Sequence, residues 1–293
     1  MPKSPESLVN LPSADSLAPL MADLRRDDRD RYLTALLAPP VMREGLLAVY
    51  GFNLEAARVR ETVSEELIGR MRLQWWRDRL DDIFAGTPPK HPVAEPLAWA
   101  VRRFGLDRKL FEDLIDARED DLAAGQPDDL QALVGHARQT ALPVMRLALQ
   151  ILDQDRGEAA AAAEELAIAQ GVSGAARAVP FHMRAGIIRL PVDLCADAGL
   201  DVGRLRDRGP AGQEEALTRV IREISGHAED RLGQARRHRF PRAALPAFLP
   251  ARLSARDLKR LARADFNPFA GSVMRVDGLR PLVLLAARLR GRV

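Results

Sequence analysis

The chain has 293 residues, of which 47% are hydrophobic and 29% charged, so it can form both a packed core and a solvated surface. Its single cysteine excludes a disulfide framework and a thiolate metal cluster, and favours an intracellular compartment. The net charge of +3 suits an anionic lipid, a nucleic acid or an acidic partner, and no stretch approaches the roughly 18 uninterrupted apolar residues of a membrane-spanning helix.

The chain begins with a polar stretch that does not resemble a cleaved targeting peptide. Glu6 and Asp15 are acidic residues where such a peptide has none, and a secretory-type apolar core is missing. We therefore expect a flexible lead-in over residues 1–22, followed by one domain over residues 23–293.

Apolar residues then recur three or four positions apart, which is the spacing of helices. The predicted helices run, in chain order, through Leu46, Tyr50 and Leu54, then Ile68, Met71, Trp75, Trp76 and Leu80, then Phe111, Leu114, Ile115 and Leu122, with Pro- and Gly-rich breaks between them. Trp75 and Trp76 are predicted to pack rather than to form a ligand platform. The pattern predicts an all-α, single-domain helical bundle with more than half of its residues helical and no sheet beyond a small hairpin near residues 185–190.

Two pairs of aspartates stand four residues apart on predicted helices. They are Asp78 with Asp82, and Asp116 with Asp120. Two such pairs on facing helices could hold Mg²⁺ against a diphosphate. Both pairs lie among arginines on a polar face, however, so we favour a solvated helix surface.

No nucleophile, nucleotide-binding or zinc motif is recognisable, and Cys195 is interpreted as a buried bystander. The most basic segment contains Arg236, Arg237 and Arg239 at the end of a predicted helix. Favourable interaction of these cations with the helix dipole is a sufficient explanation, and a patch for anionic lipid or a partner is the alternative. Aromatic residues scarcely alternate with the arginines, so nucleic acid is not an expected partner.

The segment YGFNLEAARVRE, from Tyr50 to Glu61, resembles the first signature of squalene and phytoene synthases, approximately YAFCRxxDDxxD. The resemblance implies that the acidic positions bind magnesium in active members of that family. Here these positions fall on Ala57, Arg58 and Glu61, so one carboxylate of three remains.

The segment GVSGAARAVPFHMRAGIIRLP, from Gly171 to Pro191, resembles the second signature, approximately QxxNxxRDxxxD followed by a YLP-type turn. Arg177 matches the signature arginine, and the two aspartates fall on Ala178 and His182. Pro180 lies inside the motif, so we expect the helix to end near it.

These replacements imply a chain without catalytic residues, metal ligands or a cofactor, since alanine, arginine and histidine are poor ligands for hard Mg²⁺. Arg58, Arg60 and Arg177 could instead bind a phosphate through charged hydrogen bonds.

One branch of the family is more similar still, the non-catalytic complex I assembly factors. The resembling stretches are Val63–Ala94, which contains RLQWW and HPVA, Ala169–His182, Leu190–Leu200, Ala244–Pro250 and Leu258–Phe269. The resemblance implies an isoprenoid synthase fold with degenerate metal motifs. It also implies subunits or assembly intermediates of complex I as partners. Because the N-terminus does not resemble a transit peptide, we expect a bacterial, cytoplasmic protein with peripheral contact at the inner membrane. An isoprenoid, or an anionic lipid at the arginine-rich segment, is a further expected ligand.

Two alternatives remain open. One is a divergent Mg²⁺-dependent prenyl transferase that condenses two allylic diphosphates, which retained carboxylates on facing helices would favour. The other is a protein that binds a prenyl lipid or a quinone, which a closed, arginine-rimmed apolar cavity would favour. A filled cavity with an exposed apolar patch would favour the assembly factor.

Overall fold

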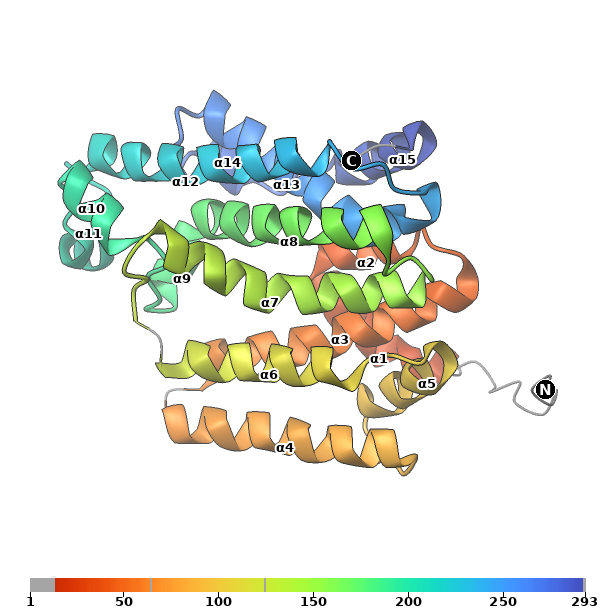
Figure 1. The fold of residues 1–293 in the computed structure, drawn as a ribbon. Coiled ribbons are helices and arrows are strands. Elements are labelled where there is room, and N and C mark those ends of the chain that lie inside the picture. Colours follow the sequence, from red (N-terminus) through yellow and green to blue (C-terminus); the bar gives the residue numbers. More distant parts are fainter. Residues whose placement is uncertain (1–13, 64, 124, 292–293) are drawn as a thin grey trace.

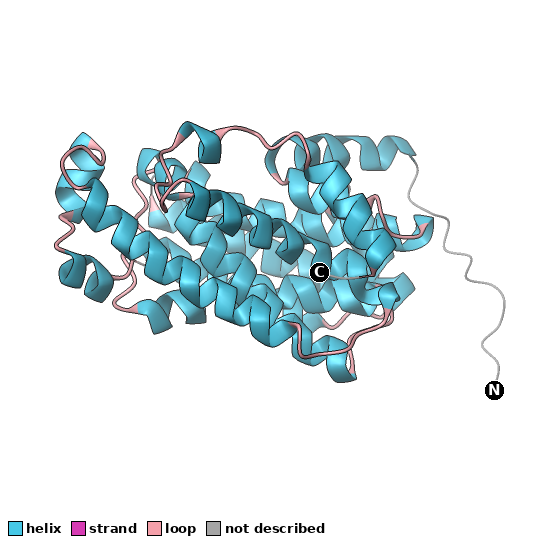
Figure 2. Cartoon of the chain, turned by 90° about the horizontal axis from the view of Figure 1, so that it is seen from above, coloured by secondary structure: helices cyan, strands magenta, loops and turns pink. Residues whose placement is uncertain are grey.

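The computed structural model describes residues 14–63, 65–123 and 125–291 (Figure 1). In these residues 77% of positions are helical and no strand occurs, which confirms the predicted all-α fold (Figure 2). The hairpin expected near residues 185–190 is wrong. This stretch has no second strand to pair with, and the next backbone donors, Val192 N and Asp193 N, bond to the carbonyls of Pro127 and Asp128 instead.

The N-terminal part contributes two short helices and one long one: α1 (Ala14–Asp27), α2 (Arg29–Ala35) and α3 (Pro40–Thr62). Helix α1 begins within the expected lead-in, because Leu17, Leu20 and Leu24 share one helical face and are buried. Leu20 packs over Gly51 of α3, where a larger residue would clash. Residues 1–13 of the expected lead-in lie outside the described residues.

Three helices complete the first half of the bundle: α4 (Glu66–Ala85), α5 (Ala94–Phe104) and α6 (Arg108–Ala123). Helix α4 ends at Gly86, whose φ of +85° is a left-handed conformation that glycine adopts without strain. It packs against α5 and α6 and forms the outermost layer in Figure 1. Trp76 is buried against Phe52, whereas Trp75 is 37% exposed, so the packing prediction holds fully for one of the two.

The second half is built around α8, which packs against three other long helices. The central helix is α8 (Gly157–Arg177), and the three around it are α7 (Leu130–Ile151), α12 (Glu214–Ala235) and α13 (Leu245–Arg263). Small residues allow the close approach. A methyl group added at Gly171 of α8 would lie 2.5 Å from Ala137 Cβ of α7.

Short helices connect and cover these layers. They are α9 (Val179–Arg184), α10 (Val192–Ala198), α11 (Val202–Arg208), the 3₁₀ turn η1 (Arg242–Ala244), α14 (Gly271–Met274) and α15 (Arg280–Arg290). Pro180 lies in the first turn of α9, so the predicted break after α8 is confirmed. No helix in the described ranges is long and apolar enough to cross a bilayer.

Candidate functional site

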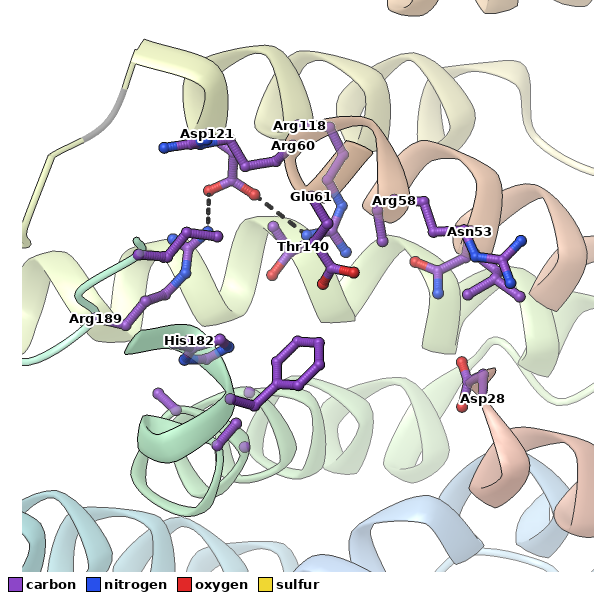
Figure 3. A pocket seen from close by; sticks show the side chains of 18 of the residues that line it. Asp28, Asn53, Arg58, Arg60, Glu61, Arg118, Asp121, Thr140, His182 and Arg189 are labelled. Atoms are coloured by element: carbon purple, nitrogen blue, oxygen red, sulfur yellow. Dashed lines mark hydrogen bonds and ion pairs between the residues drawn. The ribbon is translucent and has the colours of Figure 1, made fainter. Parts of the chain in front are cut away.

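Helices α3 and α8, which carry the two degenerate signatures, line one cavity of about 710 Å³ (Figure 3). Every residue singled out from the signatures lines it: Ala57, Arg58, Arg60, Glu61, Arg177, Ala178 and His182. Helices α6 and α7, the α1–α2 junction and α9 supply the remaining walls. The alanines at positions 57 and 178 leave space where the signatures have carboxylates.

The cavity wall combines apolar side chains with many charged ones. Among the described residues seven arginines and four carboxylates line it, so this lining carries an excess of three positive charges when the histidines are neutral. An excess of cations around a cavity favours an anionic ligand. The cavity therefore has the arginine rim that the lipid-binding alternative expects, but its wall is not apolar throughout.

A buried aspartate that the sequence motifs did not reveal lies among these charged residues. The Asp121 side chain on α6 is 2% exposed, and its carboxylate lies 3.2 Å from Arg118 Nη1 and 3.0 Å from Arg189 Nη2. His136 Nδ1 of α7 lies 3.2 Å from the same carboxylate. Asp121 therefore holds together α6, α7 and the segment that follows α9.

The two histidines of the cavity are neutral at pH 7. Burial lowers the pKa of His136 to about 4, assisted by the positive charges of Arg189 and Arg118 and opposed by Asp121. Burial also lowers the pKa of His182 to about 4, together with the charges of Arg189 and Arg177. His182 Nδ1 is buried without a hydrogen-bond partner in the described part of the chain. The cavity's positive charge therefore comes from its arginines.

The arginines proposed to bind an anion differ in what they contact. Arg58 forms an ion pair with Asp27 of α1, and the Arg177 Nε lies 3.2 Å from the Asp257 carboxylate of α13. Among the described residues no ion pair joins Arg60 to a carboxylate, or Glu61 to a cation. Of Arg58, Arg60 and Arg177, Arg60 is therefore the one without an ion-pair partner among the described residues.

Comparison with known proteins places this geometry in a family. The sequence model of the squalene/phytoene synthase family matches residues 24–282. The chain belongs to the squalene/phytoene synthase family. Among solved structures, a squalene synthase from Alicyclobacillus acidocaldarius superposes with a TM-score of 0.75 at 20% identity, covering 87% of this chain and 96% of its own.

Curated relatives include both an assembly factor and enzymes. "NADH dehydrogenase (ubiquinone) complex I, assembly factor 6" of Bos taurus is 34% identical over 271 residues, covering 92% of this chain and 80% of its own length. The phytoene synthase of Rhodobacter capsulatus is 28% identical over 163 residues, covering 56% of this chain and 48% of its own length.

The residues present do not fit the magnesium ions of squalene/phytoene synthases. Ala57 and Ala178 offer no donor, and Arg58 offers a cation. Glu61 remains at one of the aligned metal positions, but the other carboxylates of the cavity are paired with cations, as Asp28 is with Arg31 at 2.8 Å. In the described ranges no three Asp, Glu, His or Cys side chains gather in a way that could hold a metal ion. Hard Mg²⁺ prefers several carboxylate oxygens, so this donor set does not support a magnesium-dependent step.

The aspartate pairs first considered for magnesium lie outside the cavity. Asp116 is exposed and pairs with Arg77 at 2.7 Å, and Asp82 pairs with Arg79 at 3.1 Å. Both pairs therefore lie on the wet helix face, as predicted. The missed residues, Arg118 and Asp121, were visible as charged positions three apart within the apolar stripe of the same helix, a signal that favours burial and pairing.

Cys195 is buried, and burial raises the pKa of its thiol to about 11. A thiol with so high a pKa is a poor nucleophile at neutral pH. The burial of Cys195 and the raised pKa of its thiol agree with its interpretation as a buried bystander.

Proposed function

We propose that this chain is a non-catalytic member of the squalene/phytoene synthase family that assists assembly of complex I, the membrane-bound NADH:quinone oxidoreductase. The observation that carries the proposal is the extent of likeness to the assembly factor. It covers 92% of this chain at 34% identity, against 56% at 28% for a phytoene synthase. The partner is then a complex I subunit or assembly intermediate, met at the cytoplasmic face of the inner membrane by a peripheral protein.

The charge at the signature positions supports the absence of prenyl transfer. An allylic diphosphate ionises only when the negative charge of the leaving pyrophosphate is neutralised, which carboxylate-held metal ions do in the active relatives. Here Arg58 stands at an acidic position, and α1 supplies Asp27 to neutralise it. The site has thus exchanged metal-binding carboxylates for internal ion pairs, which hold the helices together without activating a leaving group.

The open cavity supports a second candidate function, the binding of a prenyl lipid through its phosphate without metal. Its volume of about 710 Å³ and its positive lining suit a phosphate, whereas a neutral quinone would leave the charges unmatched. Arg60 is the arginine available for this contact. Thermal melting with farnesyl phosphate in the presence of a chelator tests it: stabilisation that Arg60→Ala removes supports the binding, and its absence refutes it.

Deletion of the gene in the organism that encodes it tests the main proposal. We expect less assembled NADH:quinone oxidoreductase, measured as membrane NADH oxidation, with unchanged squalene and carotenoid levels. Glu61 is the last carboxylate at the aligned metal positions. Because the proposed role in assembly needs no metal-dependent chemistry, re-expression of the chain with Glu61→Ala should restore NADH oxidation fully. Normal oxidation combined with missing C30 or C40 hydrocarbon would overturn the proposal and favour the transferase.

A further inference from the structure

The segment that contains α14 and α15 exposes an unusual amount of apolar surface. Six of the twelve large hydrophobic side chains exposed in the described residues lie between positions 274 and 289. They are Met274 (48% exposed), Val276 (78%), Leu279 (55%), Leu282 (64%), Leu285 (48%) and Leu289 (71%). Exposing so many large apolar side chains to water is unfavourable, so the surface is expected to be covered in the cell.

The leucines of α15 form one stripe. At about 100° per residue, Leu282, Leu285 and Leu289 fall within roughly 60° of one another around the helix axis. Leu284 and Ala287 fall on the opposite side, where they are buried against Leu249 and Leu253 of α13. Packing within the fold therefore uses one side of α15 and leaves the leucine stripe unused.

Arginines flank the stripe on both sides. Arg288 and Arg290 lie on opposite sides of it by the same helical geometry. Arg288 Nη1 donates a hydrogen bond to the carbonyl of Arg242 at 3.0 Å, which places Arg242 beside α15. The acidic residue of this segment, Asp277, is already bonded to Arg256.

Further arginines extend the positive charge. Burial lowers the pKa of Arg252 on α13, and the positive charges of Arg236, Arg256 and Arg290 lower it further. Arg236 belongs to the basic segment already noted at the end of α12. We call these five residues (Arg236, Arg242, Arg252, Arg288 and Arg290) the arginine cluster. Arg242, Arg288 and Arg290 lie on or beside α15, and Arg252 and Arg236 extend the positive charge away from it. Among the described residues none of the five forms an ion pair with a carboxylate.

We propose that the leucine stripe of α15 and the arginine cluster form a docking surface for an anionic lipid bilayer. The leucines would enter the boundary between headgroups and acyl chains, and the arginines would reach the lipid phosphates, as in amphipathic helices that lie in the plane of a membrane. A second copy of this chain is a poorer occupant, because a symmetric contact would bring two arginine clusters together. The proposed function includes contact with a membrane, and this inference identifies the surface of the protein that makes the contact. It rests on the proposed function only for placing the protein at the inner membrane.

Co-sedimentation of the full chain with vesicles tests the surface. We expect binding to vesicles of equal phosphatidylglycerol and phosphatidylcholine, little binding to pure phosphatidylcholine, and weaker binding as salt rises. The triple variant Leu282→Ser, Leu285→Ser, Leu289→Ser should bind at least tenfold more weakly. The matched control replaces three exposed apolar residues of α4, Leu67, Ile68 and Met71, by serine, and should bind as the parent does.

A second measurement is independent of the stability of the variants. A polarity-sensitive fluorophore attached at Leu285→Cys should shift to the blue with anionic vesicles, and the same label at Met71→Cys should not. Equal shifts at both positions, equal binding of both triple variants, or equal binding to neutral and anionic vesicles would overturn the proposal. So would a dimer in solution that the α15 triple variant abolishes. These assays contain no complex I, so their failure would leave the assembly proposal untouched.

Discussion

Replacing Asp121 by asparagine should destabilise the fold far more than a surface aspartate on the same helix would. The substitution keeps the shape and one acceptor oxygen but removes the negative charge that matches Arg118 and Arg189. Removing one partner of a buried ion pair destabilises by about 3–5 kcal/mol. The two arginine side chains retain 17% and 18% exposure, so some water reaches them, and we expect the lower end, about 3 kcal/mol.

Urea unfolding at pH 7 measures the effect, with Asp116→Asn as the matched control. Asp116 lies on α6 as well, but its side chain is 64% exposed in its pair with Arg77. Such surface pairs contribute at most about 1 kcal/mol. Added phosphate should restore part of the loss in Asp121→Asn by replacing the missing charge beside the arginines. A loss for Asp121→Asn no larger than that for Asp116→Asn would refute the structural role assigned to this carboxylate.

Three further predictions concern the same region. Because the folded pKa of His136 and of His182 lies at about 4, below the ordinary 6.5, their neutral forms stabilise the fold above pH 6.5. That stability is lost as pH falls from 6.5 toward 4, by about 2 kcal/mol or less per histidine at pH 5, and the double glutamine variant should flatten the unfolding free energy over this range. Calorimetric titration with Mg²⁺ and a prenyl diphosphate analogue should show no metal-dependent binding, and strong binding that disappears in Glu61→Ala would contradict us. Gly171→Ala should destabilise by about 1–3 kcal/mol in urea, because the added methyl would lie 2.5 Å from a side chain of α7. Gly174→Ala, with nothing within 4 Å, should not, and equal effects of the two would argue against the close helix approach.

Local sequence patterns were sufficient for the helices and for many of their ends. The spacing of Phe111, Leu114 and Leu122 predicts α6, and Pro180 predicts the break between α8 and α9. Helical spacing depends on residues within a few turns of one another, so it can be read without knowledge of the fold. The two signatures also identified the α3 and α8 residues that meet in the cavity, although only by resemblance to a family.

Contacts between distant segments could not be predicted in this way. The charge of Arg58 looked available for a phosphate, but α1, which begins within the expected lead-in, brings Asp27 to it. Asp121 and Arg189 are 68 positions apart in the chain, and their pairing depends on how α6 meets the segment after α9. Whether a charged side chain has an ion-pair partner from a distant segment depends on the tertiary structure, and the sequence alone does not show it.

The two faces of α15 show the same difference between what the sequence determines and what depends on the tertiary structure. Its composition, rich in leucine with arginines at the end, indicates an amphipathic or buried helix and no more. Which leucines are buried depends on α13, which covers the side with Leu284 and leaves the side with Leu285 in water. Hydrophobicity is a property of each residue, and the sequence carries it. Burial is a property of what lies opposite, and only the packed tertiary structure determines it.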